Sequence, residues 1–181
     1  MYLHRNIRLH ARNYWGQTAI FATLCCFERQ SHFLRSDACL ATAEILREAA
    51  ASRRFVIHAY CFMPDHLHLL VEGLDRDSDF LNFMKTFRIR SSRRFTRSSV
   101  SLLWQKKFFD HILRASESLE SVALYIWLNP IRAGLAKNLG EYPFAGSFSR
   151  WMPHTCPIQN IWAPPKSEKS PPQKAASTGH L

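Results

Sequence analysis

The chain has 181 residues, 46% of them hydrophobic and 13% aromatic, and its 24 Lys and Arg residues exceed 14 Asp and Glu residues to give a net charge of +10. This length and hydrophobic content suit one folded domain, and the lack of a run of about 18 apolar residues argues against a membrane-spanning segment. The positive charge predicts a polyanionic partner, for which nucleic acid and an anionic membrane surface are the two candidates.

Two features of the sequence bear on the cellular compartment. The N-terminal arm, residues 1–13, carries Arg5, Arg8 and Arg12 without an apolar core, which is not typical of a signal peptide. The five cysteines are odd in number and none has C-x-x-C spacing, which favours reduced structural thiols over a zinc site. We therefore expect a cytoplasmic, nucleoid-associated protein.

The first expected elements are a strand and a helix. Residues 19–25 (AIFATLC) are β-prone. Asp37 precedes a stretch with apolar residues at helical spacing through Leu46 and Ala49, and is predicted to cap that helix.

Residues 55–72 contain two β-prone runs separated by Met-Pro-Asp at 63–65, which predicts a β-hairpin. If Phe62 pairs with His66, the period of two puts His66 and His68 on one face of the sheet. The same face would carry His58 and Tyr60, and the opposite face would carry Leu67, Leu69 and Val71.

An amphipathic basic helix is predicted over residues 80–97. Its apolar stripe consists of Phe80, Phe83, Met84 and Phe87. Residues 80–109 hold eight cations and no acid, namely Lys85, Arg88, Arg90, Arg93, Arg94, Arg97, Lys106 and Lys107. Such a run is often a solvated face, but the interleaved aromatic residues favour nucleic-acid binding, in which Arg holds phosphates and rings stack on bases.

The last predicted elements are a strand over residues 104–113 and a helix that begins at Ser116 and carries Tyr125. Pro130 is expected to kink this helix, or to stop and restart it. Residues 14–152 then form the folded domain, and residues 153–181 form a Pro/Lys/Ser-rich, disordered tail. The order of strands and helices, with a central antiparallel pair, predicts an α+β sandwich.

Three residue types could carry chemistry. His66 and His68 lie about 7 Å apart along one strand face, close enough to bind one metal ion, although H-x-H can also be two polar residues on a solvent face. Tyr125 and Asn129 share a helical face if the helix persists. From spacing alone, the favoured interpretation is that Tyr125 is an ordinary half-buried aromatic residue and that Asn129 caps the turn at Pro130.

Four motifs in order, HAYCFMPDHLHLLVE, LWQKKFFDHIL, YIWLNPIRAGL and EYPFAGS, give the chain a resemblance to a known family. Over about residues 14–150 it resembles the REP-associated tyrosine transposases, which are single-tyrosine transposases of the HUH class. The resemblance implies a ferredoxin-like α+β sandwich of the HUH endonuclease type, in which a central antiparallel sheet with helices directs the two histidines toward the tyrosine helix.

The resemblance also implies a chemistry. His66 and His68 would hold a divalent metal, Mg or Mn, with Asn129 as a third ligand in place of the Gln of better-known relatives. Tyr125 would attack hairpin-forming single-stranded DNA, keep the 5′ phosphate and free a 3′ hydroxyl, without a nucleotide cofactor. The DNA would be held by the arm and by the eight cations of residues 80–109, and the protein would act as a monomer or homodimer.

Two other functions fit the same sequence. One is a non-catalytic protein that binds DNA or RNA hairpins, which needs the basic helix but neither Tyr125 nor the histidines. The other is a metal-dependent phosphodiesterase that uses activated water in place of tyrosine.

Overall fold

The structure is a computed structural model that describes residues 9–95, 102–149 and 162–165. Its elements in order are β1 (Ala19–Cys25), α1 (Ser36–Arg53), β2 (Phe55–Met63), β3 (His66–Gly73), α2 (Phe80–Phe95), β4 (Phe109–Ile112), α3 (Leu119–Arg132) and β5 (Ala145–Gly146). Three short 3₁₀ turns precede α1, namely η1 (Ala11–Tyr14), η2 (Phe27–Arg29) and η3 (His32–Leu34). None of the helices in these ranges is both long and apolar enough to cross a membrane.

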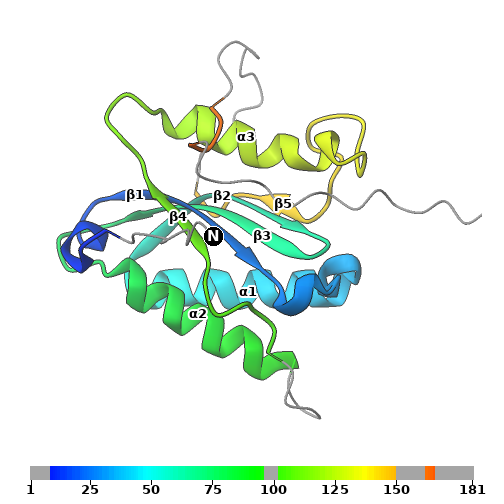
Figure 1. The fold of residues 1–181 in the computed structure, drawn as a ribbon, viewed down its shortest axis with the longest axis horizontal. Coiled ribbons are helices and arrows are strands. Elements are labelled where there is room, and N and C mark those ends of the chain that lie inside the picture. Colours follow the sequence, from blue (N-terminus) through cyan, green and yellow to red (C-terminus); the bar gives the residue numbers. More distant parts are fainter. Residues whose placement is uncertain (1–8, 96–101, 150–161, 166–181) are drawn as a thin grey trace, which may run out of the picture.

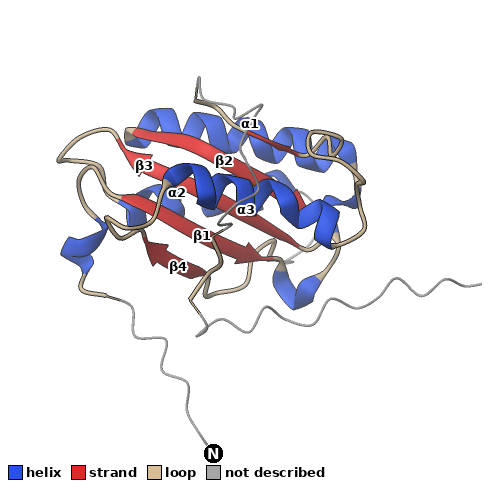
Figure 2. Ribbon diagram, turned by 90° about the horizontal axis from the view of Figure 1, so that it is seen from above, coloured by secondary structure: helices blue, strands red, loops and turns tan. Residues whose placement is uncertain are grey.

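The strands form one sheet in the order β4-β1-β3-β2-β5, and each neighbouring pair is antiparallel. The first six elements alternate as βαββαβ with the order β4-β1-β3-β2, which is the ferredoxin-like arrangement. Helices α1 and α2 lie on one face of the sheet and α3 lies on the other (Figures 1 and 2). The predicted α+β sandwich is confirmed.

Alternation along the strands produces a core on each face of the sheet. Leu67 and Leu69 pack in the core beneath α1 and α2, which also contains Phe83 of α2. Phe21 and Leu70 pack in the second core, beneath α3. Since both faces are covered, a polar side chain on β3 must find a partner within the protein or in a ligand.

The β-hairpin forms as predicted, but its register differs by one residue. Met63 pairs with His66, and Cys61 pairs with His68, because the turn consists of Pro64 and Asp65 alone. This turn is held from outside by Phe33 N–H donating to the Pro64 carbonyl and Cys26 N–H donating to the Asp65 carbonyl.

The shift in register changes which residues share a face with the histidines. Tyr60 pairs with Leu69 and packs against the core beneath α1 and α2, so the prediction that it shares the face of His66 and His68 is wrong. His58 is the extra residue at an irregularity between Ile57 and Ala59, and its Nε2 contacts Glu72 at 2.8 Å.

Predicted helix starts and one strand also need correction. Asp37 does not cap α1, because its carboxylate accepts two hydrogen bonds from Arg35 and no side chain caps the helix. Helix α3 is capped by Ser118, whose Oγ accepts from the Ser121 N–H at 3.1 Å, and Ser116 lies before it. Strand β4 covers only residues 109–112, since the preceding segment turns away to pack against α2.

Helix α3 continues through Pro130 to Arg132, so the predicted stop and restart at Pro130 does not occur. A proline inside a helix removes one backbone donor and leaves the carbonyl four residues earlier without its usual partner. Here that carbonyl belongs to Ile126, and the Asn129 side chain approaches it. The continuous helix keeps Tyr125 and Asn129 one turn apart on α3.

Candidate active site

The histidines of β3 converge on one point on the α3 face of the sheet. The Nε2 atoms of His66 and His68 are 3.0 Å apart, and their rings are nearly perpendicular, at 86°. His66 Nδ1 lies 2.6 Å from Asp65 Oδ1, and His68 Nδ1 lies 2.9 Å from Thr23 Oγ1. Both rings are therefore held at Nδ1, which leaves the Nε2 atoms directed toward each other.

Burial and neighbouring charges keep His68 neutral. It is 7% exposed, and burial lowers its pKa well below the ordinary histidine value, with further lowering by the charges of His66, Arg29 and Arg132. An ionised carboxylate only accepts hydrogen bonds, so His66 donates from Nδ1 to Asp65, and in the neutral ring this tautomer leaves the lone pair on Nε2. The close approach of the two Nε2 atoms is then explained in one of two ways. Either His68 donates a hydrogen bond from Nε2–H to His66 Nε2, or both Nε2 lone pairs bind one cation.

The spacing of the two nitrogens fits a shared metal ion. Two nitrogens that each bind one ion at about 2.1 Å can lie at most about 4.2 Å apart, and the His66 and His68 Nε2 atoms, 3.0 Å apart, are within that limit. Within the described ranges no group of three or more His, Cys, Asp and Glu residues could hold a metal. A further ligand from the described residues would therefore be of another kind, such as an amide oxygen, and water or a phosphate oxygen could add to it.

Asp65 links the histidines to a cation at the end of β1. Its Oδ2 lies 2.8 Å from Arg29 Nε, and Arg29 also donates to Cys25 Sγ at 2.8 Å. Burial raises the pKa of Asp65, but the hydrogen bond from His66 and the charges of His66 and Arg29 outweigh burial and lower the pKa overall. In the sequence Asp65 is predicted only as a turn residue, although its position directly before the H-L-H motif is a signal of this second role.

Tyr125 of α3 lies on the same face as the histidines. Its ring centroid is 6.2 Å from that of His68 and 5.9 Å from that of Phe21. The guanidinium of Arg132 lies over the Tyr125 ring, 4.7 Å from the centroid, and donates to the Tyr125 carbonyl. Sequence spacing did not reveal Arg132, which is seven residues from Tyr125 and shares its side of the helix.

Asn129 is 8% exposed and its amide is oriented by its own helix. The Nδ2 group donates to the Tyr125 carbonyl at 2.9 Å and lies 3.4 Å from the Ile126 carbonyl. Pro130 cannot donate a backbone hydrogen bond to that Ile126 carbonyl because it has no N–H. Because both neighbours are acceptors, the nitrogen must be the atom that faces them. The amide oxygen therefore points away from these carbonyls.

Trp162 packs against this face from a segment predicted to be disordered. Its ring centroid is 5.2 Å from Tyr125 and 5.0 Å from Phe21, and its Nε1 donates to Glu117 at 2.6 Å. Only residues 162–165 of the predicted tail, residues 153–181, lie in the described ranges, and within them the Trp162 side chain is buried against this face.

Glu117 accepts hydrogen bonds from several groups beside Trp162. It accepts from the Arg114 N–H at 2.7 Å, and its carboxylate oxygens lie 2.8 and 3.0 Å from His111 Nε2. Burial raises the pKa of Glu117, but these donors together with Trp162 lower the pKa below its ordinary value. The helix predicted to begin at Ser116 would have included Glu117, but Glu117 lies in the loop before α3, where it joins β4 to Trp162.

The predicted DNA-binding cations are divided between several parts of the molecule. On α2, on the face opposite Tyr125, Lys85, Arg90, Arg93 and Arg94 are exposed. Arg88 is turned inward, donating to the Gln105 and Lys106 carbonyls and lying over the Phe108 ring. Exposed cations elsewhere are Arg12 in η1 and Lys106 and Lys107 before β4, whereas Arg5, Arg8 and Arg97 lie outside the described residues.

Comparisons with known proteins agree with this arrangement. The sequence model of the family described as "Transposase IS200 like" matches residues 17–128, more than half of the chain. A REP-associated tyrosine transposase of Escherichia coli K12 is 25% identical over 126 residues, covering 69% of this chain and 73% of that protein. A Haemophilus influenzae protein named as a candidate of the same kind is 29% identical over 103 residues, covering 51% of this chain and only 58% of the relative.

A solved structure has the same fold. It is described as a REP-associated tyrosine transposase bound to a REP hairpin, and it superposes with a TM-score of 0.62 at 21% identity, covering 80% of this chain and 82% of that one. At this identity the likeness concerns the fold, and the family assignment comes from the match over residues 17–128. The chain belongs to the family of IS200-like transposases.

Proposed function

We propose that this protein cleaves and rejoins hairpin-forming single-stranded DNA through a covalent bond between Tyr125 and a 5′ phosphate. The observation that carries the proposal is the convergence of His66 and His68 on one point, with the Tyr125 ring on the same face, in a member of the IS200-like transposase family. The hairpin substrate is supported by the solved relative, which is described as bound to a REP hairpin.

In this proposal His66 and His68 bind a divalent metal, Mg or Mn, through Nε2, and Asn129 adds its amide oxygen. The orientation of the Asn129 amide supports this role, because its nitrogen is held by backbone carbonyls and its oxygen is directed away from them. Mg and Mn prefer oxygen ligands, so the phosphate of the DNA would complete the set. The bound metal would neutralise the phosphate oxygens and align the phosphate for in-line attack.

The chain's own groups would perform the transfer. The Tyr125 hydroxyl loses its proton as its oxygen attacks phosphorus, the bond from phosphorus to the 3′ oxygen breaks, and the departing 3′ oxygen takes up a proton as a hydroxyl, so that no net proton is gained or lost. A phenol is a weak nucleophile at neutral pH, and the guanidinium of Arg132 over the Tyr125 ring favours negative charge there. Attack by a 3′ hydroxyl on the phosphotyrosine reverses the step, so rejoining needs no nucleotide cofactor.

DNA binding in this proposal relies on the exposed cations, with Lys106 and Lys107 best placed to serve the active site. The neighbouring Gln105 donates its N–H to the Cys25 carbonyl, and Cys25 pairs with His66 across the sheet. The cations of α2 would act at a distance from the chemistry, on the other face of the sheet. The arm residues Arg5, Arg8 and Arg12 would add to the binding of the hairpin.

The test is capture of labelled DNA by the protein. Full-length protein is incubated with 3′-labelled hairpin DNA and Mn²⁺, and a denaturing gel is read for label attached to protein. Wild type is expected to give an adduct, Tyr125→Phe to bind DNA without one, and His66→Ala to give none. Cleavage without an adduct would favour activated water, and binding without cleavage of cognate hairpins would favour a non-catalytic hairpin-binding protein.

A further inference from the structure

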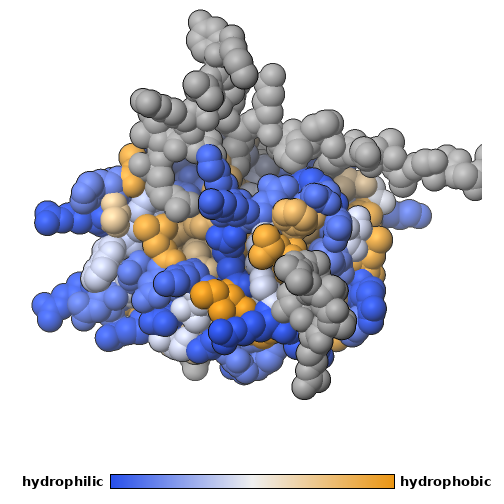
Figure 3. Space-filling view, turned by 60° about the horizontal axis from the view of Figure 1, so that its bottom comes forward, coloured by the Kyte–Doolittle hydropathy of each residue, from blue (hydrophilic) through white to orange (hydrophobic). Residues whose placement is uncertain are grey.

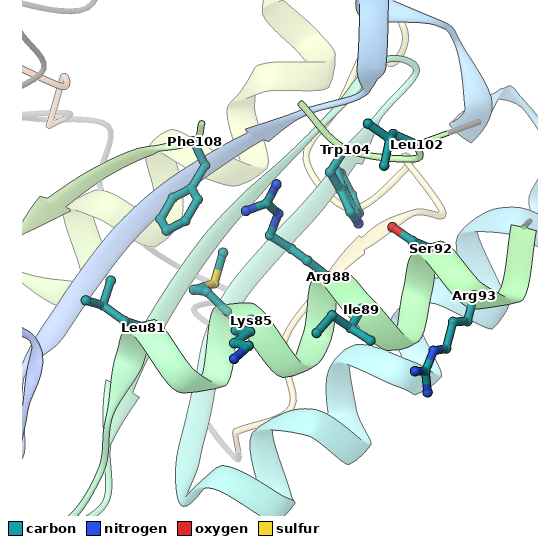
Figure 4. A pocket seen from close by; sticks show the side chains of 10 residues that line it. Leu81, Lys85, Arg88, Ile89, Ser92, Arg93, Leu102, Trp104 and Phe108 are labelled. Atoms are coloured by element: carbon teal, nitrogen blue, oxygen red, sulfur yellow. The ribbon is translucent and has the colours of Figure 1, made fainter. Parts of the chain in front are cut away.

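A groove of about 620 Å³ runs between α2 and the segment that precedes β4. Its walls come from the outer side of α2, including Leu81 and Ile89, and from Leu102, Trp104 and Phe108 of the segment (Figure 4). The volume lies within the range of about 300–1,000 Å³ that is common for ligand sites. The groove is separate from the proposed active site, because α2 and α3 cover opposite faces of the sheet.

The lining of the groove combines apolar side chains with cations. Of the described residues that line it, Lys85, Arg88 and Arg93 are charged and none is acidic. Two of the apolar residues are solvent-exposed, Ile89 at 42% and Leu102 at 58%. Figure 3 shows apolar side chains set among hydrophilic ones on the lower side of the molecule, as oriented in Figure 1. The lining therefore suits an occupant with an apolar surface and negative charge.

The groove is held open by contacts between its walls. Trp104 donates from Nε1 to Ser91 Oγ at 2.8 Å, and its ring packs against Phe87. Arg88 reaches across and donates to two carbonyls of the opposite segment, which fixes its guanidinium between Phe108 and Trp104 (Figure 4). A binding surface with walls fixed in this way loses little conformational entropy when a ligand enters.

The cations of α2 are spaced along the groove. Lys85 and Arg93 are both exposed and lie about 12 Å apart along the helix axis, with Ile89 midway between them. A planar base over Ile89 and the aromatic wall would direct its two flanking phosphates toward the two cations. This alternation of apolar contact and cation is how single-stranded nucleic acid is bound without sequence preference.

We infer that the groove binds an unpaired nucleotide of the DNA, with its base against Ile89 and the aromatic wall and its phosphates at Lys85 and Arg93. This inference rests on the proposed function, since it takes single-stranded DNA as the ligand. A duplex stem is disfavoured because its base faces are hidden by stacking and would gain nothing from the apolar floor. The nucleotide is therefore one from the loop of the hairpin or from a strand that flanks it.

A route from the groove to the active site passes through the same segment. Leu102 and Trp104 line the groove, and Gln105 is bonded to Cys25, the strand partner of His66. The exposed Lys106 and Lys107 follow directly. The groove would thus anchor one part of the strand while another part lies at Tyr125, and it contributes to affinity and not to the chemical step.

The experiment measures binding of full-length protein to fluorescent oligonucleotides by anisotropy, in EDTA so that no cleavage occurs. The probes are a single-stranded oligothymidine, an abasic strand of the same length, and a blunt duplex. Lys85→Gln with Arg93→Gln is compared with Arg47→Gln with Lys137→Gln, which removes the same charge from residues that do not line the groove. Ile89→Asn tests the base contact, and its exposure means that the variant is expected to fold.

Loss of two phosphate contacts should reduce the slope of log affinity against log salt for single strands by about 1.4 in the groove variant, and by clearly less in the control. Ile89→Asn should weaken oligothymidine binding about three- to tenfold and leave the abasic strand nearly unaffected. Equal salt slopes in groove and control variants, or an equal loss for thymidine and abasic strands with Ile89→Asn, would overturn the inference. A greater loss for the duplex than for the single strand would also overturn it.

The covalent-capture assay separates failure of this inference from failure of the proposed function. With saturating hairpin and Mn²⁺, the control variant Arg47→Gln with Lys137→Gln should form as much adduct as wild type. If wild type forms no adduct but the groove variants still lose single-strand affinity, the cleavage proposal fails and the groove assignment stands. If wild type forms the adduct and the groove variants bind as tightly as the control, the groove assignment fails alone.

Discussion

Replacing Asp65 with Asn tests whether the carboxylate that accepts a hydrogen bond from His66 increases the affinity of the proposed site for metal. Asp65 Oδ1 accepts from His66 Nδ1 at 2.6 Å, and Oδ2 pairs with Arg29 at 2.8 Å. Losing such a partner of a metal-bound histidine typically lowers metal affinity about 10- to 100-fold, which is about 1.4–2.7 kcal/mol. Asn can still accept the hydrogen bond, and the Asp65 side chain is 24% exposed, so we expect the lower end of that range, about tenfold.

The assay is adduct formation at saturating hairpin DNA over a series of Mn²⁺ concentrations. Asp65→Asn should raise the half-saturating Mn²⁺ concentration about tenfold while the adduct level at high Mn²⁺ stays close to wild type. Asp37→Asn is the matched control, because it removes the same charge at an exposed ion pair on α1. Equal Mn²⁺ requirements in the two variants would refute the reasoning that Asp65 acts on metal binding through His66.

Three further predictions concern α3 and the residues around it. Asn129→Ala should raise the half-saturating Mn²⁺ concentration for adduct formation. An unchanged concentration would mean that Asn129 does not bind the metal and only contacts carbonyls of its own helix. Trp162→Ala should lower the free energy of unfolding by about 3 kcal/mol in urea titrations, and Trp162→Phe by less, whereas no loss would mean that Trp162 does not pack on Phe21 and Tyr125. Glu117→Gln should cost about 1–2 kcal/mol of unfolding free energy at pH 7. Because the pKa of Glu117 is lowered in the folded state, its stabilisation is fully present above the unfolded-state pKa of about 4.3 and is lost as pH falls through the folded-state pKa. A difference in unfolding free energy from wild type that fails to narrow in acid would contradict the assignment.

The sequence by itself determined the elements whose signals are local. Alternating β-prone residues bounded by Pro64 and Asp65 defined the β-hairpin, and the apolar stripe from Phe80 to Phe87 defined α2. The motifs around His66 and Tyr125 identified the family, which the match over residues 17–128 confirms. These elements could be predicted because their patterns depend only on residues that are close in the chain and on the burial of one face of each element.

Tertiary structure decided what depends on distant segments. The register of the hairpin puts Tyr60 on the face opposite the histidines and depends on the two-residue turn. Backbone hydrogen bonds from Phe33 and Cys26 hold this turn, and both residues lie about 30 or more positions earlier in the chain. The continuity of α3 through Pro130 follows from packing on the sheet and from the Asn129 side chain, which together override a local helix-breaking signal.

The separation of the basic helix from the histidines is likewise a property of the fold. From the sequence, Lys85 and Arg93 are predicted to bind DNA together with Lys106. Only the topology shows that α2 lies on the face of the sheet opposite Tyr125. The contacts of Asp65, Arg29, Arg132 and Trp162 also arise between segments far apart in the chain or across helical turns. Sequence determined which residues were available for the chemistry, and packing decided which of them meet, because contacts over long chain separations depend on the whole fold and leave no local pattern.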